Sequence, residues 1–96
     1  MSSNHRVAIS GHRGLPVTTS RLVDKAIRTA LTQHDATALT GISCLADGAD
    51  QIFARAVIDL GGALEVIVPA VRYRDGLPER ACPEYDRLLA YAVEVH

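Results

Sequence analysis

The alternation of short apolar runs with amphipathic, helix-like stretches constrains the fold of this chain more than any other feature. Each apolar run is followed by residues whose apolar side chains recur with helical spacing. Such alternation predicts right-handed βαβ units and a parallel sheet. We therefore expect an α/β, Rossmann-like domain of three layers, with helices on both faces of the sheet. The expected strands are 5–10, 38–44 and 63–68, the expected helices are 18–34, 49–60 and 83–93, and 93–96 is a candidate fourth strand.

The length and composition predict one domain that spans residues 1–96. A chain of 96 residues with 48% hydrophobic residues can build a single modest core. The sequence contains no pattern typical of a signal peptide or a transmembrane span. Cys44 and Cys82 do not form a CxxC pair. We therefore expect reduced thiols and a cytoplasmic protein without a membrane partner.

The charge balance argues against a nucleic-acid partner. The formal net charge is −1, whereas proteins that neutralise many phosphates normally carry a basic excess. The chain also has one Phe and no Trp, which leaves few surfaces for base stacking. A small-molecule ligand is the partner that we expect.

The turn at residues 43–50 predicts an anion site. It connects an expected buried strand to an expected helix, so its backbone amides and the positive end of the helix dipole meet at one point. Gly48 and Ala49 supply amides at the start of that helix. At least one of Asp47 and Asp50 is interpreted as a helix cap. Because a carboxylate repels phosphate, a ligand contact of Asp50 would be to a ribose hydroxyl or a base amine.

A second turn of the same kind, residues 10–15, follows the first expected strand. Gly11 and Gly14 would let the backbone approach a phosphate closely, and Arg13 could pair with it. His12 is interpreted as a general acid or base, or simply as an exposed imidazole. The alternative for the glycines is a purely conformational role in the turn.

The loop at residues 69–78 supplies a third set of candidates. Arg72 and Arg74 offer positive charge, and Tyr73 offers a ring surface. The alternative for the two arginines is an ordinary solvated position. Loops that follow parallel strands lie at one edge of the sheet. The three loops therefore predict one pocket for a phosphate-bearing ligand.

The sequence supports no catalytic, metal or cofactor assignment. The dinucleotide pattern GxGxxG and the P-loop pattern GxxxxGK[ST] are both absent. The histidines have no metal-ligand spacing with each other or with the cysteines. We therefore expect no metal and no cofactor, and we assign no catalytic residue.

The motifs resemble those of the SLOG superfamily, which includes the Lonely Guy (LOG) phosphoribohydrolases, the DprA-type DNA-processing proteins and nucleotide-sensor domains. The resemblance covers about residues 7–91. It rests on Ile9-Ser10-Gly11-His12-Arg13, on Leu45-Ala46-Asp47-Gly48-Ala49-Asp50 with Ala54 and Ala56 in the following helix, on Gly61-Gly62, and on Glu65-Val66-Ile67-Val68-Pro69.

The resemblance implies a minimal or truncated SLOG domain in which Gly11, Arg13, Gly48 and Asp50 line a pocket for a nucleotide-derived ligand. LOG-type enzymes carry a PGGxGTxxE motif with the catalytic glutamate, and this chain lacks it. Binding or sensing is therefore preferred over turnover. The alternatives are a LOG-like hydrolase acting on nucleoside monophosphates, DprA-like binding of single-stranded DNA, and a non-enzymatic assembly module that forms a homodimer through an unpaired sheet edge.

Overall fold

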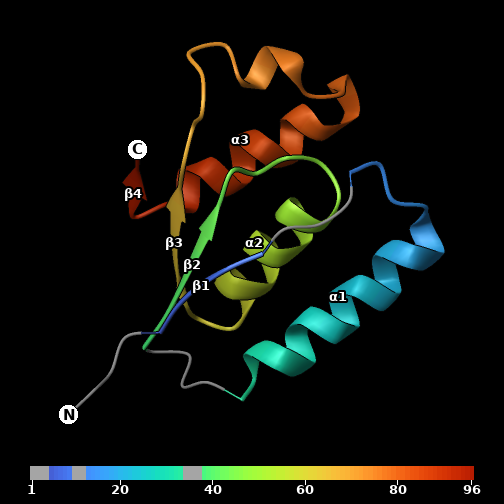
Figure 1. Ribbon diagram of the computed structural model, residues 1–96, viewed down its shortest axis with the longest axis vertical. Coiled ribbons are helices and arrows are strands. Elements are labelled where there is room, and N and C mark those ends of the chain that lie inside the picture. The colour runs from blue at the N-terminus through green and yellow to red at the C-terminus, as the bar shows by residue number, and fades with distance from the viewer. Residues whose placement is uncertain (1–4, 10–12, 34–37) are drawn as a thin grey trace.

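The computed structural model describes residues 5–9, 13–33 and 38–96, and it shows an α/β fold with a four-stranded parallel sheet (Figure 1). The predicted alternation of strands and helices is confirmed, and the candidate fourth strand forms at the edge of the sheet next to β3. Two short 3-10 helices, η2 and η3, occupy the loop after β3. The elements are β1 His5–Ala8, α1 Val17–Leu31, β2 Leu39–Ser43, α2 Ala49–Asp59, β3 Ala63–Val66, η2 Arg74–Gly76, η3 Glu79–Ala81, α3 Cys82–Tyr91 and β4 Glu94–Val95.

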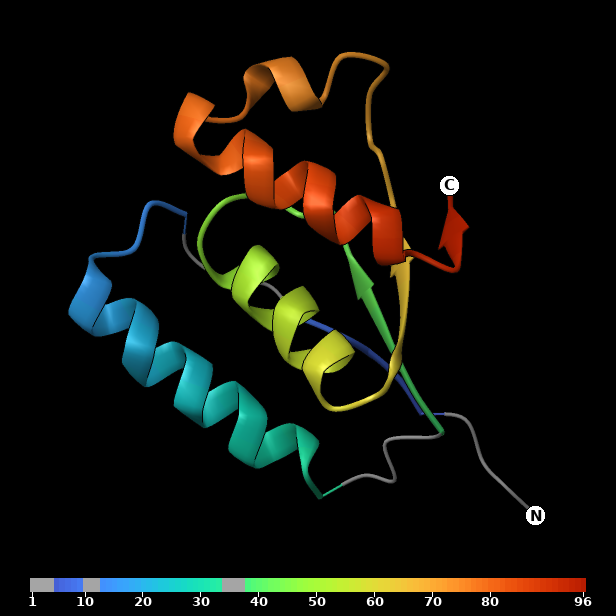
Figure 2. The same ribbon diagram turned by 180° about the vertical axis from the view of Figure 1, so that it is seen from behind.

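The expectation of helices on both faces of the sheet is wrong. The three helices lie side by side on one face, with α2 between α1 and α3 (Figures 1 and 2). The physical reason is the strand order β1-β2-β3-β4, which follows the chain. Each right-handed crossover then steps in the same direction and leaves its helix on the same side. Within the described residues, the architecture has two layers and the opposite face of the sheet carries no helix.

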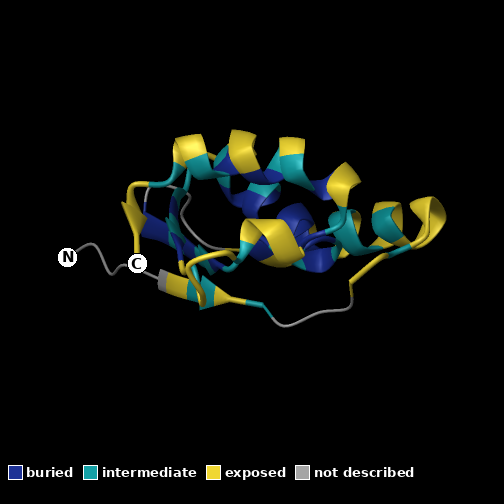
Figure 3. Cartoon of the chain, turned by 90° about the horizontal axis from the view of Figure 1, so that it is seen from above, coloured by how far each residue is buried: buried dark blue, intermediate teal, exposed yellow. Residues whose placement is uncertain are grey.

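Burial alternates along the central strands, as expected for a sheet with one covered face. In β2, Leu39, Gly41 and Ser43 are buried toward the helices, whereas Thr40 and Ile42 are half-buried on the other face. The buried residues gather between the sheet and the helices (Figure 3). The core is formed by buried side chains of the sheet, of the turn after β2 and of the inner faces of α2 and α3. They include Leu45, Phe53, Ala54, Val57, Leu64, Val66 and Leu88.

The start of the first helix differs from the sequence-based expectation. We expected this helix to begin at residue 18, but α1 begins at Val17, and the Ser20 amide donates to the Pro16 carbonyl at 2.8 Å. Pro16 precedes the helix, where its missing N–H costs no intrahelical hydrogen bond.

Among the described residues, no helix combines the length and apolar character needed to cross a membrane.

Candidate functional site

The segments that follow β1, β2 and β3 lie at the carboxyl edge of the sheet (Figure 1). Gly11 and His12, which we predicted as ligand contacts, lie outside the described residues. Arg13 and Gly14 represent the first turn, and Asp47, Gly48, Ala49 and Asp50 represent the second. The first two turns are brought together, as the sequence predicted.

The Asp47 carboxylate joins the two turns. Its Oδ1 accepts a hydrogen bond from Arg13 Nε at 2.7 Å, and its Oδ2 accepts one from the Gly14 amide at 2.9 Å. The Asp47 side chain is only 8% exposed, whereas Arg13 is 56% exposed. Gly14 has a φ of 62°, in the left-handed region that favours glycine. Asp47 therefore belongs to the second turn and also bonds to the first. The sequence did not predict this contact between the two turns.

Asp47 and Asp50 respond to burial in opposite ways. Burial favours a higher pKa for Asp47, but the hydrogen bond and positive charge of Arg13, with the Gly14 amide, outweigh it and hold the pKa below its usual value. At Asp50, burial dominates and raises the pKa, although the Ala46 amide donates a hydrogen bond to the side chain. Asp47 is therefore the fixed negative charge of the site.

Replacing Asp47 with asparagine is expected to destabilise the fold in a pH-dependent way. Loss of the charged acceptor should lower the free energy of unfolding at neutral pH by about 1 kcal/mol. Because the folded-state pKa of Asp47 is depressed, its stabilisation is complete above the unfolded pKa of about 4 and is lost as pH falls through the folded pKa. Thermal melts from about pH 3 to about pH 8 would measure this difference.

Asp50→Asn is the matched control for Asp47→Asn, because the pKa of Asp50 is shifted upward in the folded protein. Ionisation of Asp50 is disfavoured by folding, so removal of its charge is not expected to lower stability at neutral pH. An equal loss of stability in both variants, or a loss in Asp47→Asn that does not change with pH, would contradict the assignment.

A cavity of about 290 Å³ lies beside the Asp47 contacts. Gly14 and Gly48 line it from the two turns, and Arg55 of α2 and Arg80 of η3 add positive charge. Gly48 has φ 83° and ψ −131°, a conformation open mainly to glycine, and α2 begins at the next residue. The amino end of the α2 dipole is therefore close to the cavity.

Gln51 holds the η3 segment against the second turn. Its Nε2 donates to the Leu45 carbonyl and to the Ala81 carbonyl, both at 3.1 Å, from a buried position. The second bond fixes the backbone next to Arg80. The Arg80 guanidinium is 4.0 Å from Asp47 Oδ2, and its side chain is 73% exposed. Arg80 is thus near the cavity and only loosely paired.

The expectation that the third loop, residues 69–78, joins the pocket is wrong: none of its residues lines the cavity, and a later arginine, Arg80, does. Arg72 and Arg74 do not line it: Arg72 pairs with Asp75 at 2.9 Å, and Arg74 makes a bidentate contact to Asp86 at 2.8 and 2.7 Å. Of these two carboxylates, Asp75 lies in η2 and Asp86 lies in α3. Arg80 follows two residues after Pro78, the last residue of the predicted loop.

Four polar side chains that line the cavity were not among the site residues predicted from the sequence. Arg80 was detectable as a further arginine between the third strand and the last helix. Gln51 and Arg55 had no such signal, because only the packing of α2 brings Gln51 to Ala81 of η3 and Arg55 to Glu84 of α3. The four residues are Ser20, Gln51, Arg55 and Arg80.

Comparison with known proteins assigns no family. Against models of protein families and against curated proteins, the chain matches none. The geometry of the cavity is therefore the basis for a functional proposal.

Proposed function

We propose that this chain binds a nucleotide or a nucleotide-derived phosphorylated ligand in the cavity beside Asp47, as a SLOG-type binding or sensing domain. The observation that carries the proposal is the convergence of two glycine turns with Arg55 and Arg80 around one cavity. Glycines permit close backbone approach, and guanidinium groups match the geometry of phosphate oxygens. The α2 amino terminus adds a favourable dipole.

The pairing of the charges supports an anionic ligand. Asp47 is already bonded to Arg13 and Gly14, which reduces its repulsion of an incoming phosphate. Among the residues that the structure describes, the ion pairs of the two arginines are long: Arg80 lies 4.0 Å from Asp47, and Arg55 lies 3.4 Å from Glu84. A phosphate would offer each of these arginines shorter, charge-assisted hydrogen bonds.

The cavity volume limits the size of the ligand. At about 290 Å³ it lies at the lower end of small-molecule sites, which span about 300–1,000 Å³. This volume favours a mononucleotide, or the phosphoribosyl part of a larger ligand, over a whole dinucleotide. The absence of GxGxxG from the sequence agrees with that preference.

Isothermal titration calorimetry with a panel of nucleoside monophosphates, nucleotide sugars, free nucleosides and inorganic phosphate tests the proposal. At least one nucleotide should bind about tenfold or more tightly than its nucleoside, because the phosphate makes the charged contacts. Arg80→Gln should weaken that nucleotide by about tenfold. Arg72→Gln is the matched control, since Arg72 is exposed and lies outside the cavity, and it should bind as the unsubstituted protein does.

Three outcomes distinguish the alternatives. The absence of binding by every phosphorylated compound, or equal losses in Arg80→Gln and Arg72→Gln, would contradict the proposal. Release of free base from a nucleoside monophosphate, detected by chromatography, would instead support the phosphoribohydrolase alternative.

A further inference from the structure

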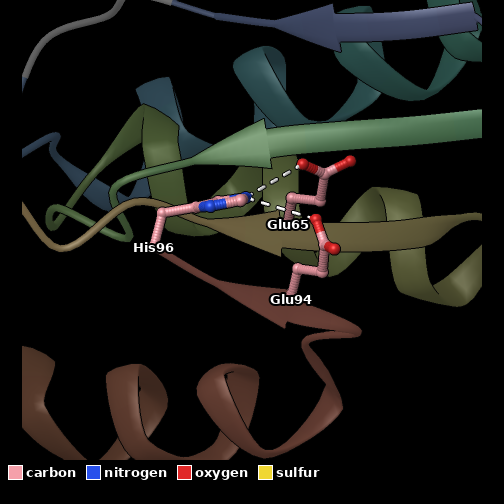
Figure 4. Close-up of side chains that lie close together, drawn as sticks. All are labelled: Glu65, Glu94 and His96. Atoms are coloured by element: carbon pink, nitrogen blue, oxygen red, sulfur yellow. Dashed lines mark hydrogen bonds and ion pairs between the residues drawn. The ribbon is translucent and has the colours of Figure 1, made fainter.

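A second cluster of polar side chains lies on the face of the sheet opposite the helices. Glu65 of β3 and Glu94 of β4 are direct partners in the parallel register, so their side chains share a face. His96 follows Glu94 by two residues, and its imidazole lies beside both carboxylates (Figure 4). The cluster is separate from the cavity beside Asp47, because none of its three residues lines that cavity.

The distances in this cluster suit ligands of one metal ion. His96 Nε2 is 3.3 Å from Glu65 Oε1 and 3.3 Å from Glu94 Oε2, and one ligand atom from each residue falls within 4.8 Å of the others. Two ligands at zinc bond lengths of 2.0–2.2 Å and a tetrahedral angle are about 3.4 Å apart. The two distances from His96 Nε2 are close to that value.

The backbone and a neighbouring arginine restrain the cluster. The His96 amide donates to the Val66 carbonyl at 2.8 Å, and the Val68 amide donates to the His96 carbonyl at 2.9 Å. The backbone that carries the imidazole is therefore held against β3. Arg6 Nη2 donates to Glu65 Oε1 at 2.9 Å, which orients that carboxylate as outer partners commonly orient metal ligands.

The charges of the cluster favour a bound cation. Like charges directly opposite each other on neighbouring strands are destabilising, and Glu65 and Glu94 occupy such positions. Among the described side chains, Arg6 pairs with Glu65 and not with Glu94. A metal ion shared by the two carboxylates would relieve the remaining repulsion.

We propose that Glu65, Glu94 and His96 bind a divalent transition-metal ion of the zinc type. A mixed imidazole and carboxylate set suits Zn²⁺ and Co²⁺ better than Mg²⁺ or Ca²⁺, which prefer oxygen ligands alone. Three protein ligands leave a coordination position for water. Because β4 has two residues and both are exposed, the ion would tie this short edge strand to β3.

Zn²⁺ titration by calorimetry, followed by Co²⁺ absorption spectroscopy, tests the site on the intact chain. The expected result is one Zn²⁺ per chain, with an affinity reduced at least about tenfold in His96→Gln and in Glu94→Gln. Glu79→Gln is the matched control, because Glu79 is an exposed glutamate on η3 outside the cluster. Circular dichroism would verify that each variant folds.

The same experiment excludes the competing explanations. Cys44 is a potential zinc ligand, although burial raises the pKa of its thiol and so disfavours the thiolate. A thiolate-to-cobalt charge-transfer band, or Zn²⁺ affinity unchanged in both cluster variants, would overturn the proposal. No detectable Zn²⁺ binding would also overturn it. None of these results depends on whether a nucleotide binds beside Asp47.

Discussion

Replacing Leu64 with alanine is expected to lower the free energy of unfolding by about 3–5 kcal/mol. Leu64 is 1% exposed on β3 and packs in a cluster with Leu45, Val66 and Leu88, each fully buried. The substitution removes apolar contacts and leaves a cavity that surrounding side chains fill only in part. Since small domains are stable by about 5–15 kcal/mol, this loss is a large share of the total.

Urea denaturation would measure the effect, with Leu22→Ala as the matched control. Leu22 lies on α1 and is 67% exposed, so the same chemical change should alter stability by no more than about 0.5 kcal/mol. Similar losses in the two variants would contradict the two-layer packing, because they would place both leucines in equivalent surroundings.

A single methyl group at Gly41 is expected to cost about 1–3 kcal/mol. Gly41 lies on β2 directly beneath α2, and a Cβ there would be 2.7 Å from Val57 Cγ2 and 3.2 Å from Phe53 Cε2. Val57 is fully buried and Phe53 is 2% exposed, so neither side chain can move away easily. The helix or the strand must shift instead.

Gly76→Ala provides the comparison for Gly41→Ala. A Cβ at Gly76 would have no neighbouring heavy atom within 4 Å. Alanine should therefore be neutral there or stabilising by up to about 1 kcal/mol, because it restricts the unfolded chain. Thermal melts of the two variants would measure the contrast, and a harmless methyl group at Gly41 would refute the close contact between β2 and α2.

The periodicity of the sequence was sufficient to predict the element types, but it could not place the helices around the sheet. Apolar runs such as those at β2 and β3 identify strands because their side chains must avoid water. Which face a helix covers depends on the spatial order of the strands. The order β1-β2-β3-β4 places α1, α2 and α3 together, which the local pattern does not encode.

Part of the candidate site was predictable from the sequence, because several of its residues follow directly after predicted strands. Arg13, Gly14, Asp47 and Gly48 adjoin strand ends, so their meeting at one edge follows from the parallel arrangement. Arg80 and Gln51 join them only because η3 folds back over α2, where Gln51 bonds to Ala81. The choice between Arg72, Arg74 and Arg80 likewise depends on which carboxylates lie nearby.

The residue pattern alone therefore established a parallel α/β chain with two glycine turns at one edge, because strand, helix and turn preferences are local. Contacts between distant segments depend on the three-dimensional arrangement. Packing places Arg80 beside Asp47 across 33 positions of sequence, and strand register brings Glu65 to Glu94 and His96. The interaction energy between two charged side chains depends on the distance between them, and only the folded chain sets that distance.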